Sequence, residues 1–279
     1  MIIIKQISKI KETLSNLKNI DRKVGFVPTM GALHKGHISL IKKSKAENDF
    51  TVCSIFVNPT QFTNAVDLQK YPVTIETDIN QLELAACDIL FLPATPEMYK
   101  EGEVEQHYEL GNLETILEGK YRPGHFQGVC IIVDKLLEII QPTTIYLGKK
   151  DYQQCMVINK MMITKKIETK LELCNTVREQ DGLAMSSRNA RLNKTERLNA
   201  AKIFESLKYI GEEIKPGNLE NLKISATKFL TKNGYKVDYI EIADAQTLEL
   251  VNNWDGEKKL VALVAAYLND VRLIDNVIL

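Results

Sequence analysis

Two of the four histidines in this 279-residue chain, His34 and His37, lie three residues apart, directly after an apolar run and a glycine-bearing turn (residues 24–33). If a helix begins there, residues three apart share one face, so both imidazoles can reach the same ligand. A helix N-terminus also offers backbone N–H groups and a positive dipole end, which favour a phosphate. This arrangement predicts a site for nucleotide phosphates. A zinc site is a weaker interpretation, because the segment lacks a third ligand and a His-Glu-x-x-His spacing.

Amide side chains follow the next apolar run. Asn58 and Gln61 come directly after residues 50–57, whose β-branched and apolar pattern predicts a buried strand. In open α/β sheets, ligands bind outside the carboxyl ends of the strands, and amides both donate and accept hydrogen bonds. The pair therefore suits a ligand that carries hydroxyl groups and a carboxylate. A plain turn is the alternative, since Asn-Pro is a common turn signal.

Basic residues occur in two further segments. Arg122 lies within Tyr-Arg-Pro-Gly-His-Phe (residues 121–126), whereas Lys149 and Lys150 follow a predicted strand and open a predicted helix. Asp151 would cap that helix, which would place Lys150 at the ligand edge of the sheet as a phosphate-binding cation. A solvated lysine pair is the alternative.

A compact anion-binding loop is predicted at Ser186, Ser187 and Arg188, which follow a glycine within residues 178–189. Arginine can bind phosphate oxygens through two parallel hydrogen bonds, and two hydroxyls stand beside it here. A surface loop that joins two domains is the alternative. Because the loop follows the last predicted strand of the sheet, it can cover the ligand face.

Strands and helices alternate through the first part of the chain, which predicts βαβ units and a Rossmann-like, doubly wound parallel sheet of the α/β class. After about residue 176, two helices precede three strands, which predicts a smaller C-terminal α+β domain. We therefore expect one domain over residues 1–176 and a second over residues 177–279. The expected strands are 24–27, 50–57, 89–93, 144–147, 171–174, 237–243, 260–268 and 271–274; the expected helices are 35–47, 75–86, 127–140, 152–165, 194–213 and 219–233, with a helix or loop at 244–254.

Composition argues against nucleic acid and membrane partners. Lys+Arg and Asp+Glu both number 36, and a net charge of zero does not provide a general basic surface. Even the long apolar run that includes residues 261–268 is far shorter than the ~20 residues that cross a bilayer. The first residues lack the apolar core of a signal peptide. The cysteines form no Cys-x-x-Cys pair, which favours buried, reduced thiols in the cytoplasm: Cys53, Cys87, Cys130, Cys155 and Cys174.

The order of these segments resembles the nucleotidyltransferase superfamily, in which a His-x-Gly-His motif and a downstream Lys/Ser/Arg loop bind ATP phosphates. Within that superfamily, residues 24–192 resemble the pantothenate synthetase (pantoate–β-alanine ligase) family. Five segments carry the resemblance: Pro-Thr-Met-Gly-Ala-Leu-His-Lys-Gly-His (28–37), Val-Asn-Pro-Thr-Gln-Phe (57–62), Tyr-Arg-Pro-Gly-His-Phe (121–126), Gly-Lys-Lys-Asp-Tyr-Gln-Gln (148–154) and Asp-Gly-Leu-Ala-Met-Ser-Ser-Arg-Asn (181–189).

The resemblance implies an ATP-dependent condensation of (R)-pantoate with β-alanine, which yields pantothenate, AMP and pyrophosphate through a pantoyl adenylate. It also implies small-molecule partners (ATP, pantoate and β-alanine), Mg²⁺ with the ATP, a homodimer, a cytoplasmic enzyme of coenzyme A biosynthesis and a C-terminal lid domain. Residues 63–77 and the Ser-Ser-Arg loop are expected to close over the adenylate, because water would hydrolyse it.

The resemblance further implies roles for individual residues. His37, His34, Lys150 and Arg188 would be catalytic, with His37 as a proton donor. Gln61 and Gln154 would bind pantoate, with Asn58 and Arg122 as further substrate-binding candidates. Asp78 and Gln81 would contact the metal. The implied ATP-binding residues are Met30, Gly31, Ala32, Leu33, His34, Lys35, Gly36, His37, Gly148, Lys149, Lys150, Asp151, Val177, Met185, Ser186, Ser187 and Arg188.

Three other functions stay open at this point. A structural or docking protein is the least favoured of them, because polar residues gather at the predicted strand ends and form no apolar stripe. A nucleotidyltransferase that moves AMP or CMP to a phosphorylated alcohol shares the His-x-Gly-His turn, but it does not account for Gln61, Gln154 and the paired serines. A nucleotide-binding regulator without catalysis would need fewer charge-stabilising residues than this chain carries.

Overall fold

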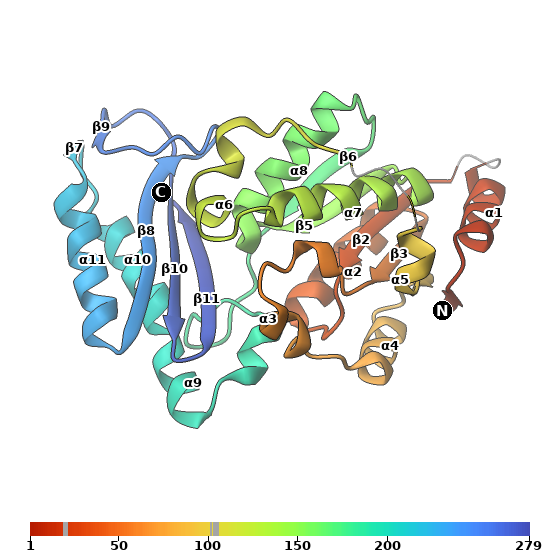
Figure 1. Ribbon diagram of the computed structural model, residues 1–279, viewed down its shortest axis with the longest axis horizontal. Helices are drawn as coiled ribbons and strands as arrows, with labels where there is room; N and C mark the ends of the chain where they lie inside the picture. The colour runs from red at the N-terminus through yellow and green to blue at the C-terminus, as the bar shows by residue number, and fades with distance from the viewer. Residues whose placement is uncertain (19–21, 101, 103–105) are drawn as a thin grey trace. The chain divides into compact units, whose positions relative to one another are not determined.

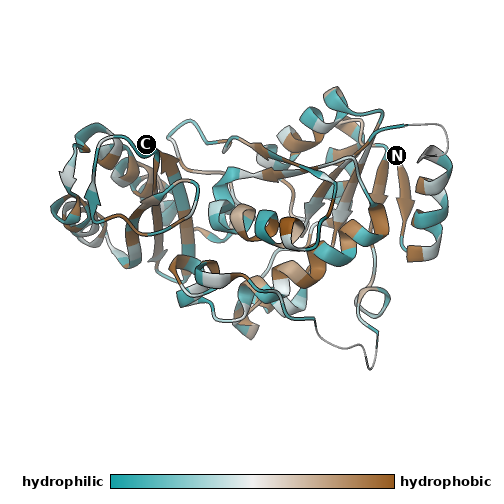
Figure 2. Ribbon diagram, turned by 90° about the horizontal axis from the view of Figure 1, so that it is seen from above, coloured by the Kyte–Doolittle hydropathy of each residue, from teal (hydrophilic) through white to brown (hydrophobic). Residues whose placement is uncertain are grey.

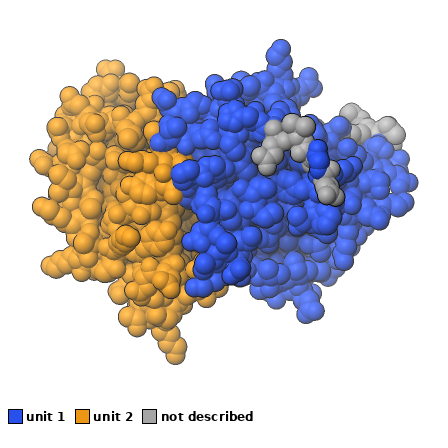
Figure 3. Space-filling view, viewed as in Figure 1, with its two compact units in different colours: residues 1–115, 122–149, 154–175 blue, residues 116–121, 150–153, 176–279 orange. Residues whose placement is uncertain are grey.

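The computed structural model describes residues 1–18, 22–100, 102 and 106–279. Contacts divide the chain into two compact units, which Figure 3 shows in different colours. Unit 1 comprises Met1–Thr115, Arg122–Lys149 and Gln154–Asn175, and unit 2 comprises Ile116–Tyr121, Lys150–Gln153 and Thr176–Leu279. Two short segments that the sequence analysis placed in the first domain thus group with the second unit. The expected division into functional domains stays a prediction.

Unit 1 is built on a six-stranded parallel sheet with the strand order β1-β4-β3-β2-β5-β6. The chain adds β3 and β4 on one side of β2, and then β5 and β6 on the other side, so the winding reverses between β2 and β5 (Figure 1). Ligands of such sheets bind at the carboxyl ends of the strands beside this reversal. The predicted doubly wound α/β fold is confirmed. The strands are β1 (Ile2–Ile4), β2 (Val24–Thr29), β3 (Phe50–Ile55), β4 (Ile89–Phe91), β5 (Thr144–Gly148) and β6 (Lys170–Cys174).

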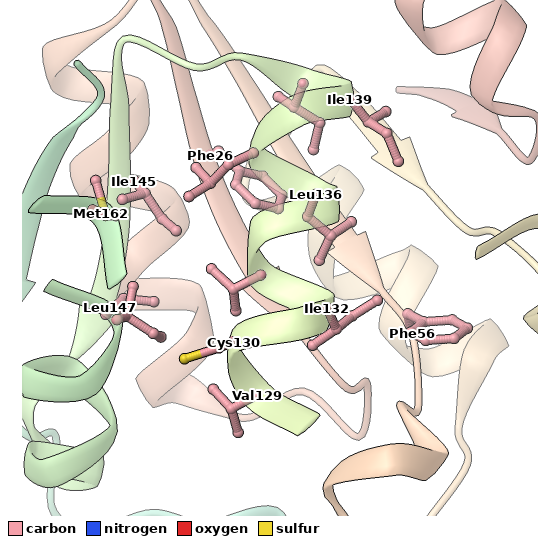
Figure 4. Packing of buried hydrophobic residues seen from close by; sticks show 14 of the residues in the cluster. Phe26, Phe56, Val129, Cys130, Ile132, Leu136, Ile139, Ile145, Leu147 and Met162 are labelled. Atoms are coloured by element: carbon pink, nitrogen blue, oxygen red, sulfur yellow. The ribbon is translucent and has the colours of Figure 1, made fainter. Parts of the chain in front are cut away.

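Helices cover both faces of this sheet because strand side chains alternate between the faces. On β2, Phe26 packs in one apolar cluster with α1, α7 and α8, whereas Val27 packs in another with α2 and α4. Figure 4 shows the first cluster, in which Leu136 of α7 lies beside Phe26. The helices are α1 (Ile7–Lys18), α2 (Lys35–Glu47), α4 (Ile75–Leu84), α7 (His125–Ile140) and α8 (Tyr152–Thr164).

Shorter elements connect these strands and helices. They are η1 (Pro59–Gln61), α3 (Ala65–Gln69), α5 (Thr95–Met98), η2 (Gly111–Glu114), α6 (Leu117–Tyr121) and η3 (Lys149–Asp151).

The parallel strands are mostly hydrophobic in Figure 2, as expected for strands buried on both faces. Within the described residues, none of the helices combines the length and apolarity that a bilayer crossing requires. The five cysteines are all buried and free, which confirms their predicted burial; the cytoplasmic location that they favour stays a prediction.

Unit 2 contains a three-stranded antiparallel sheet with the order β11-β10-β8. Helices α10 and α11 pack against these strands around an apolar cluster that contains Leu207 and Val264. The predicted helix 194–213 is wrong in one respect, because the chain turns at Ala201 and forms two helices. The elements are η4 (Ser187–Arg191), α9 (Lys194–Ala200), α10 (Lys202–Glu213), β7 (Gly217–Asn218), α11 (Glu220–Lys232), β8 (Tyr235–Asp244), β9 (Asn253–Trp254), β10 (Leu260–Leu268) and β11 (Val271–Ile278).

Candidate active site

The turn between β2 and α2 depends on left-handed backbone at two residues. Gly31 has a φ of 80° and Ala32 a φ of 49°. A Cβ at Gly31 would approach the Asp78 carboxylate to 3.1 Å, so glycine suits both the backbone and the space. The Thr29 hydroxyl accepts from the Gly31 N–H at 3.2 Å and donates to the Ser54 carbonyl at 2.7 Å. The turn is thereby fixed to strand β3.

A buried carboxylate of α4 holds the same turn. Asp78 is 0% exposed; its Oδ2 accepts from the Ala32 N–H at 2.9 Å, and its Oδ1 accepts from the Leu33 N–H at 2.8 Å and from the Thr74 hydroxyl at 3.1 Å. Gln81 lies one turn later and donates to the Leu33 carbonyl at 3.2 Å. Both residues assigned to a metal therefore bind the backbone of the turn between β2 and α2. This placement favours a positioning task for Asp78, since both of its oxygens already accept hydrogen bonds; its metal contact stays a prediction.

His34 and His37 form a reciprocal capping box at the start of α2. Nδ1 of His34, the N-cap residue, accepts from the Gly36 N–H at 3.1 Å, and Nδ1 of His37 accepts from the His34 N–H at 3.3 Å. Because a backbone N–H can only donate, both Nδ1 atoms are unprotonated in this arrangement, and the proton of each neutral ring is on Nε2. The ring centroids are 4.0 Å apart. Two Nε2–H donors thus belong to one helix N-terminus, where a phosphate is favoured.

Gln61 lies in a buried polar cluster after the end of β3. Its side chain accepts from Asn58 Nδ2 at 3.2 Å and donates to the Met30 sulfur at 3.2 Å. Asn58 is 1% exposed; its Nδ2 also donates to the Gly128 carbonyl at 3.0 Å, and its Oδ1 accepts from the Tyr99 hydroxyl at 2.5 Å. Asn58 therefore supports Gln61, and this burial does not favour the predicted direct contact of Asn58 with a substrate.

Residues of the 121–126 segment reach the backbone of the same cluster. His125 is buried, and its Nδ1 lies 2.7 Å from the Gln61 carbonyl oxygen. Arg122 donates to that carbonyl through Nη2 at 3.5 Å. The structure thus brings Arg122 next to Gln61, as the prediction requires. The sequence analysis assigned no role to His125, which is a second support of Gln61.

The carboxyl end of β5, which pairs with β2, carries further candidates. Gly148 ends the strand, and the Lys149 ammonium donates to Asn175 Oδ1 at 2.9 Å. Of the two glutamines at the start of α8, Gln153 is buried, whereas Gln154 is partly exposed. The exposure of Gln154 is compatible with its predicted contact with a ligand.

In unit 2, residues 177–185 form a small hairpin that leads into the Ser-Ser-Arg loop. The Met185 N–H donates to the Val177 carbonyl at 3.0 Å. The Ser186 hydroxyl then accepts from the Arg188 N–H at 3.3 Å and caps η4. The predicted loop is therefore a defined turn of this unit and not an extended linker.

Lys150 also belongs to unit 2 by its contacts. Its ammonium lies 3.5 Å from the Asp151 carboxylate, and its side chain is 17% exposed. Its carbonyl accepts from Asn276 Nδ2 at 2.8 Å. The sequence analysis missed Asn276, although the polar Asp275-Asn276 pair, in a strand whose other residues except Arg272 are apolar, was a visible signal.

The donor set offers little for a protein-bound metal. In the part of the chain that the structure describes, no group of three or more His, Cys, Asp or Glu side chains could hold an ion. Mg²⁺ commonly keeps several waters and binds through nucleotide phosphates. The assignment of Asp78 and Gln81 to Mg²⁺ therefore stays a prediction.

Three features together indicate an α/β nucleotide-binding protein. They are the reversal of the winding in the parallel sheet, the turn between β2 and α2 that Asp78 holds (the clamped turn), and the His-x-Gly-His capping box. The chain belongs to the pantoate-beta-alanine ligase family, whose sequence model matches residues 2–278. It is accordingly an enzyme of pantothenate formation.

Individual relatives match over nearly their whole length. The chain is 43% identical to the pantothenate synthetase of Bacteroides fragilis over 281 residues, with 99% of this chain and 98% of the relative covered. It superposes on a pantothenate synthetase from Thermus thermophilus with a TM-score of 0.91 at 35% identity, and 99% of each chain is covered. A pantoate-beta-alanine ligase from Francisella tularensis, described as complexed with beta-gamma ATP and beta-alanine, gives a TM-score of 0.84 at 41% identity, with 100% of this chain and 97% of that chain covered.

Proposed function

We propose that this enzyme joins (R)-pantoate to β-alanine and cleaves ATP to AMP and pyrophosphate, with a pantoyl adenylate as the intermediate. The observation that carries the proposal is the capping box of His34 and His37, which assigns two Nε2–H donors to the N-terminus of α2. The Francisella tularensis ligase, described with beta-gamma ATP and beta-alanine, supports the choice of co-substrates.

Adenylation activates the pantoate carboxylate, because a free carboxylate is a poor electrophile for an amine. In the first step, a pantoate carboxylate oxygen attacks the α-phosphorus of ATP, and the bond from that phosphorus to pyrophosphate breaks. In the second step, the β-alanine amine attacks the acyl carbon and loses a proton, and AMP leaves. Neither step needs a protein nucleophile, so positioning and charge stabilisation supply the catalysis.

The residues of the clamped turn are assigned to the ATP phosphates. His34 and His37 stabilise the charge that develops on the departing pyrophosphate through their Nε2–H groups. His37 is also the proposed proton donor. The clamp by Asp78 keeps the backbone of the turn in one conformation while the phosphates change charge.

The basic residues of the second unit complete the proposed ATP contacts. Lys150 and Arg188 neutralise the phosphates, and Ser186 and Ser187 donate hydrogen bonds to them. Asp151 binds the ribose, and the backbone at Val177 and Gly148 surrounds the adenosine. Mg²⁺ as the companion ion of ATP, a homodimer and a cytoplasmic location are part of the same proposal.

The proposal is tested by omission. Purified protein with ATP, Mg²⁺, pantoate and β-alanine should produce AMP and pantothenate, and removal of any one component should stop the formation of pantothenate. Without β-alanine, the enzyme should exchange labelled pyrophosphate into ATP only when pantoate is present. Exchange with a phosphorylated alcohol instead of pantoate would favour the nucleotidyltransferase alternative, and tight ATP binding without turnover would favour a regulator.

Gln61→Ala is expected to raise the KM for pantoate about tenfold or more, with a small effect on the KM for ATP. The reason is that the Gln61 amide is held in place by Asn58 and is proposed to bind pantoate. Steady-state kinetics with each substrate varied in turn measure the difference. Gln246→Ala, at an exposed glutamine, is the control. An unchanged pantoate KM removes Gln61 from the site.

Gly128→Ala tests the support beneath Gln61. A Cβ at residue 128 would lie 2.4 Å from the Thr60 carbonyl oxygen and 2.7 Å from the Gln61 nitrogen, both backbone atoms. Overpacking of this kind costs about 1–3 kcal/mol, so Tm should fall and the pantoate KM should rise. Thermal unfolding and kinetics check both effects. Gly211→Ala is the control, because its Cβ would meet only a side-chain atom at 3.5 Å; identical behaviour of the two variants contradicts the prediction.

A further inference from the structure

A charged pair in unit 2, Arg178 and Asp275, consists of two residues that have no assigned role toward a substrate. Arg178 donates to Asp275 through two parallel hydrogen bonds, Nη1 to Oδ2 at 2.6 Å and Nη2 to Oδ1 at 3.0 Å. The Asp275 side chain is 0% exposed, and the Arg178 guanidinium lies 3.9 Å from the centre of the Phe204 ring. Burial raises the pKa of the Asp275 carboxyl, and the hydrogen bonds from Arg178 act in the opposite direction.

The pair fixes the hairpin that precedes the Ser-Ser-Arg loop. Arg178 also donates to the Gly182 carbonyl at 3.0 Å and forms a β-bridge with Ala184. At Gly182 the backbone is left-handed (φ 91°), and a Cβ would lie 2.3 Å from the Phe204 ring. These contacts restrict the hairpin to one backbone conformation, and the hairpin ends directly before Ser186.

The same network reaches Lys150 through Asn276. The Asn276 N–H donates to Asp275 Oδ1 at 2.8 Å, and its carbonyl accepts from Arg178 Nη2 at 3.2 Å. Its side-chain Nδ2 donates to the Lys150 carbonyl at 2.8 Å. Asn276 is only 6% exposed, so water does not readily replace this bond. One set of hydrogen bonds thus connects the backbone of Lys150 to the start of the Ser-Ser-Arg loop.

A contribution to stability does not by itself explain why polar residues occupy these buried positions. Asp275 and Asn276 pair with Val264 and Leu263 of the neighbouring strand, in a sheet that is otherwise largely apolar. A buried ion pair costs desolvation free energy, and well-packed apolar residues of similar volume often give equal or greater stability. A different explanation is that these polar groups position a cation. By holding the backbone of Lys150, they limit the positions that its ammonium group can take.

We propose that Asn276, anchored by the Arg178–Asp275 pair, is a positioning residue that holds Lys150 and the Ser186–Arg188 loop in one arrangement for the phosphates. The inference rests on the proposed function of Lys150. A misplacement of about 1 Å can cost a catalytic group about 100-fold in rate. Because a positioned cation acts on charge that develops during the reaction, loss of its position lowers kcat more than it changes the ATP KM.

The test is a double-mutant cycle in pantoate-dependent exchange of pyrophosphate into ATP. Asn276→Asp replaces the Nδ2 donor with an oxygen of similar size that faces the Lys150 carbonyl, and we expect kcat to fall about tenfold with little change in the ATP KM. Lys150→Ala is expected to lower kcat/KM by about 100-fold. Because Asn276 acts through Lys150, the double variant should also lose about 100-fold, whereas independent effects would multiply to about 1000-fold.

Controls separate positioning from folding. Asn276→Ala is made in parallel, so that the donor is removed without a new charge if Asn276→Asp does not fold. Lys223→Met removes another buried cation of unit 2, which is bound to Glu241 and Asn252 at 3.0 Å each, and should lower Tm while kcat measured well below Tm is unchanged. The inference is overturned if the double variant loses about 1000-fold in rate, or if both Asn276 variants have the wild-type kcat. Either result leaves the proposed function of Lys150 intact. Wild-type activity of Lys150→Ala overturns both the inference and the proposed function of Lys150.

Discussion

Replacement of His37 by alanine is expected to lower kcat/KM for pantothenate formation by about 10²-fold or more. The ring supplies an Nε2–H donor at the N-terminus of α2, and removal of one such preorganised donor typically costs about 10² to 10³ in rate. The variant also loses the Nδ1 acceptor for the His34 N–H, which should cost about 1 kcal/mol of stability, as the loss of a helix cap does. Steady-state kinetics and thermal unfolding measure the two effects separately.

Two further variants show which nitrogen of His37 matters. In His37→Asn, the amide oxygen can take the place of Nδ1 and accept from the His34 N–H, but the Nε2–H donor is gone. We therefore expect this variant to keep nearly wild-type stability and to be almost as inactive as His37→Ala. His107→Ala is the matched control, since that side chain is 66% exposed. Rates of His37→Asn within a few-fold of wild type would remove the Nε2–H group from the chemistry.

The strands of the parallel sheet were predictable because their signal is local. Runs such as residues 50–55 are apolar and β-branched, and a buried parallel strand needs nothing more for its assignment. The signal is weaker for β1, which has only three residues and gains its stability from its pairing with β4, 87 residues later in the sequence. Helix α1 was not predicted either, although Ile10 and Leu14, four residues apart, mark its buried face.

The candidate site divides in the same way. His34 and His37 were found because a helix start and the spacing of its caps are written in consecutive residues. The supporting roles of other residues were not predicted, since their partners are distant in sequence: Asp78 lies 45 residues from Leu33, and Asn276 lies 126 residues from Lys150. Asn58 was interpreted as a ligand contact because its burial depends on Tyr99 and Gly128, which no local pattern reveals. Sequence therefore supplied the candidate chemical groups, and the structure added the residues that hold these candidates in place.

The structure also changes what should be expected of Asp78, which the sequence analysis assigned to Mg²⁺. Asp78→Ala is expected to destabilise the protein by about 3 kcal/mol, because it removes the carboxylate that accepts from the N–H groups of half-buried Ala32 and buried Leu33, at about 1–3 kcal/mol each. Asp78→Asn keeps one acceptor oxygen and should lose roughly half as much. Urea unfolding of both variants measures the change in the free energy of unfolding. Glu83→Ala, at an exposed residue of the same helix, is the control and should be neutral.

Activity of the Asp78 variants then separates the two roles. If the carboxylate holds the turn, Asp78→Asn should have a lower kcat, since His34 and His37 follow the displaced backbone, while the Mg²⁺ concentration for half-maximal activity stays at the wild-type value. If the carboxylate binds the ion, the same variant should need more Mg²⁺, and excess Mg²⁺ should restore its rate. The hydrogen bonds to both carboxylate oxygens favour the first outcome, because an ion would have to compete with backbone donors that the fold itself supplies. If excess Mg²⁺ restores the rate of Asp78→Asn, and this variant is as stable as the wild type, then Asp78 binds the metal and does not hold the turn.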